Sequence, residues 1–171
     1  MTHLQRSHQQ ESALPPPLEI AATMRRLLVQ TLDMTLKHQR TDGVCALGSI
    51  LLLDAFHKFT PHRSVIRGGG GDNDGVRDVS GNWRGHYWVE LEIAGEPTVA
   101  DITADQFGWP EIIIEPLTSL RDRYRAGDQA ELNRHIESVR AWLAADEGDE
   151  QALRSGSPDL GAAARLRNSR I

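Results

Sequence analysis

The stretch GHYWVELEIAGEPTVADIT, residues 85–103, determines the fold predicted for the chain. Residues 86–93 alternate in side-chain polarity, and their aromatic and β-branched members suit a strand. The turn residues AGEP, 94–97, separate them from a second strand, TVADIT at 98–103, which predicts an antiparallel hairpin. A turn at 94–97 places Asp101 within a residue or two of His86 on the neighbouring strand. The opening of a strand beside a loop is also an accessible position for His86.

Helical patterns lie on both sides of the hairpin. Apolar residues recur at spacings of three and four over 18–38, 44–59 and 128–145. RSVIRG (63–68) and IIIEPL (112–117) add two short strands, the second an edge strand stopped by Pro116. The order of elements predicts an α+β fold with helices packed on one face of a small antiparallel sheet.

The length of 171 residues suits one domain. We expect a flexible N-terminal arm over 1–17, a single domain over 18–145, and a polar, disordered C-terminal tail over 146–171. The Gly- and Asp-rich segment 68–85 predicts a long mobile loop, either a lid over a site or a solvated linker. It lacks the spacing of a phosphate-binding loop or an EF-hand. Its acidic residues, Asp72, Asp74 and Asp78, favour a basic partner.

Composition excludes several classes of function. The formal net charge of −5 argues against nucleic acid as a partner. The longest apolar run, ILLLDAF, is far too short to cross a membrane, and no apolar signal segment opens the chain, so we expect a cytoplasmic protein. A single cysteine excludes an internal disulfide and zinc sites that need two thiolates. The spacing of His57, His62 and His86 matches no metal motif, so we expect neither metal nor cofactor.

The single cysteine, Cys45, follows the turn TDG and opens a strongly helical run. A helix N-terminus and a neighbouring imidazolium both stabilise a thiolate, which is the nucleophilic form of cysteine. His86 is a candidate for the imidazolium, and a histidine in this role needs an acceptor on its other ring nitrogen. Asp101 and Asp105 are the candidates for that acceptor. We prefer Asp101, because a carboxylate within a strand requires a reason, whereas Asp105 resembles a loop or cap residue.

The chain order Cys, His, Asp resembles the papain-like and transglutaminase-like cysteine enzymes. The resemblance is carried by DGVCALGSILL around Cys45, GHYWVEL around His86 and VADITADQFG around Asp101, and it covers about residues 40–108. It implies a papain/transglutaminase-like core in which the three residues form a catalytic triad. It also implies that Gln39, six residues before the cysteine, contributes to an oxyanion hole. Ala46 replaces the tryptophan that commonly follows a papain cysteine, which places the chain nearer to the transglutaminase-like members.

The resemblance implies acyl transfer from an amide or ester carbonyl of a protein or peptide substrate. Cys45 would form a thioester, His86 would move the proton, and Asp101 would fix the imidazole tautomer. Hydrolysis, deamidation and cross-linking share this chemistry, and the sequence does not separate them or indicate an oligomeric state. The alternative is an inactive protein-binding module that retains the fold.

Overall fold

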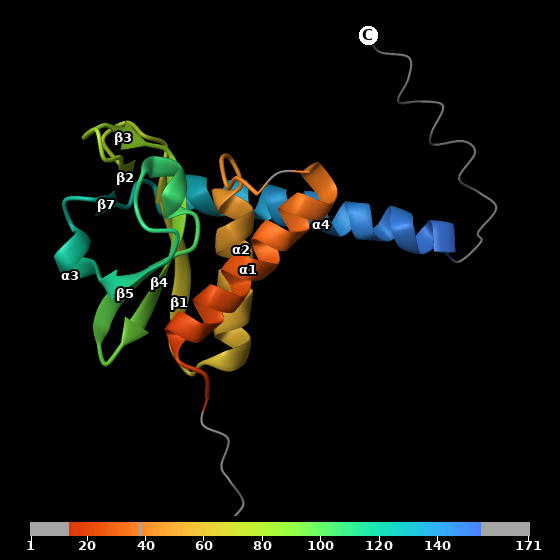
Figure 1. The fold of residues 1–171 in the computed structure, drawn as a ribbon, viewed down its shortest axis with the longest axis horizontal. Helices are drawn as coiled ribbons and strands as arrows, with labels where there is room; N and C mark the ends of the chain where they lie inside the picture. Colours follow the sequence, from red (N-terminus) through yellow and green to blue (C-terminus); the bar gives the residue numbers. More distant parts are fainter. Residues whose placement is uncertain (1–13, 38, 155–171) are drawn as a thin grey trace, which may run out of the picture. The chain divides into compact units, whose positions relative to one another are not determined.

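A computed structural model of the protein describes the backbone of residues 14–37 and 39–154, and the side chains of 14–37 and 39–145. Within these residues the fold is α+β, with four α-helices and a four-stranded antiparallel sheet (Figure 1). The residues 1–13 of the predicted arm and 155–171 of the predicted tail lie outside the described part. None of the described helices is long and apolar enough to cross a membrane.

The main sheet has the strand order β1-β4-β5-β6, and every neighbouring pair is antiparallel. Its strands are β1 (Ser64–Gly69), β4 (His86–Ile93), β5 (Glu96–Asp101) and β6 (Ile113–Pro116). The hairpin β4–β5 turns at Ala94 and Gly95, both at positive φ, and pairs Ile93 with Glu96. The two strands and the edge strand that ends at Pro116 follow the sequence prediction closely.

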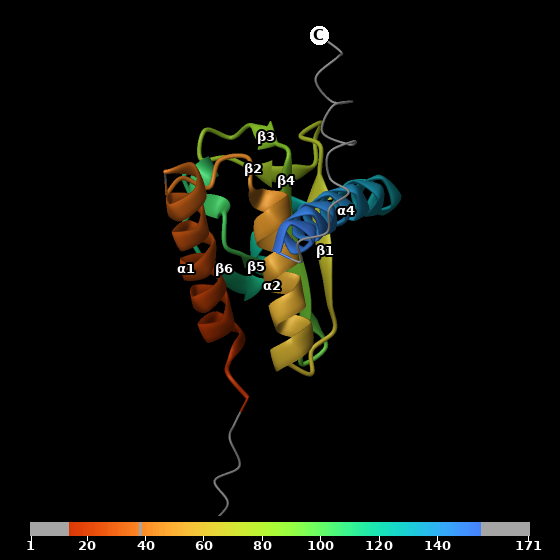
Figure 2. The same cartoon turned by 90° about the vertical axis from the view of Figure 1, so that its right-hand side faces the viewer.

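Two long helices cover one face of this sheet (Figure 2). Helix α1 (Pro17–Leu36) packs on α2 (Cys45–Phe59), and α2 packs on β4 and β1. Gly48 permits this close approach, because a Cβ there would lie 2.9 Å from the Thr103 side chain and 3.3 Å from Leu28. The N-terminus of α2 is thereby held at the end of the sheet where β4 begins and β5 ends.

The opposite face of the main sheet is covered as well. The short strands β2 (Gly75–Arg77), β3 (Trp83–Arg84) and β7 (Tyr124–Arg125) form a second antiparallel sheet in the order β3-β2-β7. Together with the one-turn helix α3 (Leu117–Leu120) they enclose a core with the main sheet. This core contains Val76, Trp88, Val99, Ala104, Ile113, Leu120 and Tyr124.

Segment 68–85 is therefore not the structureless loop that its composition predicts. Gly75 sits at a φ of +85°, and a Cβ on it would collide with the Arg84 carbonyl, so glycine is needed for β2 and β3 to pair. The prediction failed because strands of two or three residues show no periodicity, and because β7, the partner of β2, lies about fifty residues further along the chain. Because the segment contains paired strands, the predicted role as a flexible lid is not supported.

Helix α4 (Gln129–Arg154) continues beyond the predicted end at 145, into the segment expected to be disordered. Contacts divide the chain into two compact units between Leu132 and Asn133, within α4. The first unit holds both sheets, α1, α2 and α3. The predicted domain, 18–145, runs across this division.

Candidate active site

The histidine and aspartate of the hairpin are in direct contact. His86 Nε2 lies 2.6 Å from Asp101 Oδ2, and both side chains are buried. The register pairs Val89 with Ala100, so His86 lies two residues diagonally from Asp101 and on the same face of the sheet. The predicted proximity of the two side chains is confirmed by this contact.

The predicted accessibility of His86 is wrong, because its side chain has no exposed surface. Three aromatic rings surround it on the side that faces the second sheet. The Phe107 ring stands edge-on to it with centroids 4.7 Å apart, Trp88 stacks at 6.4 Å, and Tyr124 lies at 6.5 Å. The second sheet and the helical turn η1 (Ala104–Phe107), which supply Tyr124 and Phe107, exclude water from the His86–Asp101 contact.

The Asp101 carboxylate accepts hydrogen bonds on both oxygens. Besides His86, Oδ2 receives the Tyr124 hydroxyl at 2.9 Å, while Oδ1 receives the Thr103 N–H at 2.8 Å and the Thr103 hydroxyl at 3.2 Å. Burial acts to raise the pKa of Asp101, but the charge of His86 and these hydrogen bonds hold it below its usual value. The carboxylate is therefore ionised and fixed in orientation. Burial and the adjacent Asp101 raise the pKa of Tyr124 well above normal, so the tyrosine stays a hydrogen-bond donor.

His86 is protonated at neutral pH, as an imidazolium. Burial alone would lower its pKa, but the charge of Asp101, the hydrogen bond to it, and the neighbouring Cys45 together raise the pKa to about 9. The effect of Cys45 includes a hydrogen bond to the ring, and the buried Nδ1 of His86 has no other hydrogen-bond partner among the described residues. Because Nε2 is held by Asp101, Nδ1 is the ring nitrogen left to interact with Cys45.

Cys45 is the first residue of α2 and is partly exposed. Gly43, at a φ of +77°, turns the chain into the helix, and no side chain caps the first turn. The N–H groups of that turn have no acceptors within the helix and favour an anion. The charge of Cys45 also acts on Tyr87: burial, followed by that charge and Glu131, raises the pKa of the Tyr87 phenol. The thiol thus lies close to His86 and Tyr87 at the start of β4.

Asp105, the alternative partner for the histidine, has a different position. Its two oxygens accept Nη1 and Nη2 of the buried Arg25 at 2.8 and 2.7 Å, and Oδ1 also accepts the hydroxyl of the buried Thr41 at 2.8 Å. Arg25 Nη1 additionally donates to the Ile102 carbonyl at 2.7 Å. Asp105 therefore ties α1 to the segment before Cys45, while Asp101 alone contacts the histidine.

The two glutamines near the site are placed differently. Gln39 has an exposed side chain in the connection between α1 and α2, and it makes no hydrogen bond within the described part of the chain. Gln106, by contrast, donates from Nε2 to the Thr103 carbonyl at 2.8 Å, and its Oε1 lies 3.5 Å from the Gly43 N–H. Gln106 thus bridges the cysteine segment and the end of β5. Gln106 belongs to the motif DITADQF, but the sequence of this motif does not predict the contact with Gly43.

Metal ligation finds no support in the described residues, which contain no group of three or more His, Cys, Asp or Glu side chains able to hold an ion. His57, for instance, is exposed and contacts the Ser64 carbonyl at 3.3 Å. A scan against protein-family models found no match, and searches of curated proteins and of solved structures found no similar protein. The chemistry of the site therefore has to be argued from its own geometry.

Proposed function

We propose that the protein is a cysteine-dependent acyl-transfer enzyme with Cys45 as nucleophile, His86 as acid–base and Asp101 as the residue that orients the histidine. The observation that carries the proposal is the state of the His86 ring. Nε2 is bound to a fully satisfied carboxylate, while the Cys45 thiol interacts with the ring and the buried Nδ1 has no other hydrogen-bond partner among the described residues. Because buried polar nitrogens are almost always hydrogen-bonded, proton exchange with the neighbouring thiol accounts for the burial of Nδ1.

The chemistry follows from this arrangement. The Cys45 thiolate attacks an amide or ester carbonyl and forms a C–S bond, and the carbonyl oxygen becomes an oxyanion. The N–H groups at the start of α2 stabilise that charge. The His86 imidazolium gives its proton to the departing amine or alkoxide, and the neutral imidazole then takes a proton from water or from an acceptor amine. The resemblance to papain-like and transglutaminase-like enzymes, with helix α2 facing the strands that carry His86 and Asp101, supports the same core and implies Gln39 as a second oxyanion donor. Because Gln106 contacts the segment before Cys45 and Gln39 makes no hydrogen bond in the described part of the chain, Gln106 competes with Gln39 for the supporting role.

The test uses the fact that the chain has one cysteine. Native protein is treated with iodoacetamide over pH 5 to 9 and the single adduct is counted by intact mass, with the same protein in denaturant as the reference thiol. We expect native Cys45 to be alkylated at pH 6 at least about tenfold faster than the denatured chain, because the imidazolium stabilises the thiolate. The advantage should be lost in His86→Gln and reduced in Asp101→Asn, but kept in the control variant His57→Gln.

Acyl transfer itself is tested with p-nitrophenyl acetate. Attack by Cys45 breaks the ester C–O bond, releases nitrophenolate and leaves an acetyl thioester that is visible by mass. Acetylation of wild type but not of Cys45→Ala supports the enzyme. Native alkylation no faster than that of the denatured chain at pH 6, together with no acetylation, would favour the binding-module alternative.

A further inference from the structure

Two neighbouring hollows share Asp78 and Val79 in their walls, and one of them adjoins the candidate site. The nearer hollow, of about 280 Å³, is lined by Asp78, Val79, Ser80, Arg84, Gln106 and Phe107. The farther one, of about 290 Å³, is lined by residues that include Arg77, Asp78, Trp109, Asp122 and Arg123. The side chain of the shared Val79 packs on Gly108. We name the farther hollow the arginine pocket.

The nearer hollow adjoins the catalytic residues through two contacts. Phe107, in its wall, is the ring that stands edge-on to His86. Gln106, also in its wall, reaches the Gly43 N–H two residues before Cys45. A chain bound at Cys45 and extending along this wall would pass Val79, which both hollows share, and reach the arginine pocket.

The arginine pocket brings two like charges together. The Arg77 N–H donates to the Arg123 carbonyl at 2.8 Å, and the pairing of Val76 with Tyr124 places these two arginines opposite each other on one face of the second sheet. Like charges directly opposite in a sheet destabilise it. Within the described part of the chain, neither guanidinium forms an ion pair with a carboxylate. Arg77 Nε donates to the Gly81 carbonyl at 2.8 Å, and the Arg123 guanidinium lies 3.8 Å from the centre of the Trp109 ring.

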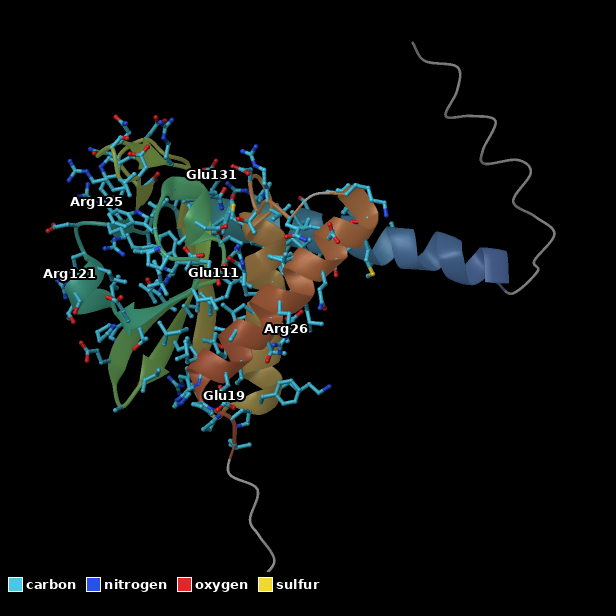
Figure 3. All side chains as sticks on the ribbon, viewed as in Figure 1. Glu19, Arg26, Glu111, Arg121, Arg125 and Glu131 are labelled. Carbon is cyan, nitrogen blue, oxygen red and sulfur yellow. The ribbon has the colours of Figure 1, made fainter. Side chains whose placement is uncertain are left out.

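The acidic residues of the pocket compensate for these charges only in part. Asp78 is occupied by the N–H groups of Ser80 and Asn82 and by Arg84 Nε at 2.9 Å. Asp122 is exposed and lies within 4.0 Å of no described cationic nitrogen. The acidic residues that favoured a basic partner in the sequence are thus partly paired inside the fold. With Asp78 neutralised by Arg84, the lining has two arginines, Arg77 and Arg123, against the one unpaired carboxylate of Asp122. Figure 3 shows two further arginines on this side of the molecule, Arg121 and Arg125.

We propose that the arginine pocket binds an acidic side chain of the peptide or protein on which Cys45 acts, an inference that rests on the proposed function. A guanidinium stacked on an indole is held in place with its N–H edges free, and the planar fork matches a carboxylate. Trp109 is itself fixed, because its Nε1 donates to the Arg77 carbonyl at 2.8 Å. A bound carboxylate would also relieve the repulsion between Arg77 and Arg123.

The probe is a set of chloroacetyl-capped hexapeptides that alkylate Cys45, the thiolate displacing chloride to form a thioether. Members of each pair differ only by glutamate or glutamine at one position, which is moved along the peptide. We expect glutamate at one or two positions to accelerate alkylation about tenfold over glutamine, because a charge-assisted contact is worth that factor or more. The preference should shrink in high salt and disappear in the double variant Arg77→Gln/Arg123→Gln. It should persist in Arg121→Gln, a matched exposed arginine that does not line the pocket.

Iodoacetamide, which is too small to reach the pocket, separates the two proposals. Fast iodoacetamide reaction of both wild type and double variant, with a glutamate preference in wild type alone, supports the arginine pocket. Fast iodoacetamide reaction of wild type with no glutamate preference at any position would overturn the pocket and leave the proposed function standing. Slow iodoacetamide reaction of wild type would count against the proposed function itself.

Discussion

The protonated state of His86 makes the stability of the fold depend on pH in a way that can be worked out. The pKa of His86 is about 9 in the folded protein, against 6.5 for an ordinary histidine. Between these values the native state binds one proton that the unfolded chain has released, so the free energy of unfolding must fall as pH rises. The stabilisation is fully present below pH 6.5 and is lost as pH rises through about 9.

The size of the effect follows from the gap between the two pKa values. At about 1.4 kcal/mol per pKa unit, the gap corresponds to roughly 3 kcal/mol, lost with a slope of about 1.4 kcal/mol per pH unit. His86 is fully buried, so solvent screening does not reduce this figure. A loss of this size is a large fraction of the stability of an ordinary domain.

Urea unfolding at a series of pH values from 6 to 9.5, followed by tryptophan fluorescence, measures this slope. The experiment is best done in Cys45→Ala, so that the thiol does not titrate in either state. In this background the decline should persist but finish at a lower pH, because Asp101 raises the pKa of His86 more than Cys45 does. The slope should vanish in His86→Gln/Cys45→Ala and remain in His57→Gln/Cys45→Ala. A flat profile, or an equal slope without His86, would refute the charged pair.

Three further predictions concern the groups around the triad. Tyr124→Phe removes a donor from the buried carboxylate, so it should cost about 1 kcal/mol and make acid unfolding begin at a higher pH, as followed by fluorescence from pH 3 to 6. Thr41→Val should slow alkylation of Cys45 at pH 6, because the Thr41 hydroxyl ties the segment before Cys45 to Asp105. Thr41→Ser keeps the hydroxyl and should restore the rate. Equal alkylation rates for the two variants would rule out a positioning role for Thr41. Gln106→Ala should slow acetylation by p-nitrophenyl acetate more than Gln39→Ala does, because only Gln106 contacts the cysteine segment, and the reverse order would return the main role to Gln39.

The sequence could predict those parts of the fold and site that depend on local pattern. Alternation and the turn at 94–97 located the hairpin, and the pairing rule then brought Asp101 to His86. The preference for Asp101 over Asp105 rested on a physical expectation, that a carboxylate inside a strand needs partners, and the four hydrogen bonds it accepts agree with that expectation.

What the sequence could not predict depends on long-range packing. Tyr124 reaches Asp101 from a strand of two residues that carries no periodic signal, and it is 23 positions away. The same strand pairs with β2 and closes the second sheet over His86, which is why a position that looked accessible is buried. Arg25 and Thr41 converge on Asp105 from separations of 80 and 64 residues, and only the packing of α1 against α2 explains that convergence.

The burial of the histidine–aspartate pair also bears on the choice between enzyme and binding module. Taking a charged pair out of water is expensive, and well-packed apolar residues of similar volume are often at least as stable in such a place. Here three aromatic rings, a tyrosine hydroxyl and a threonine surround the pair, and among the described residues Cys45 is the neighbour left for Nδ1. A role in binding alone does not account for that cost, because neither His86 nor Asp101 reaches the solvent. The proposed proton transfer to a partly exposed thiol does account for it, since it places the charge beside Cys45 while water is kept from the pair.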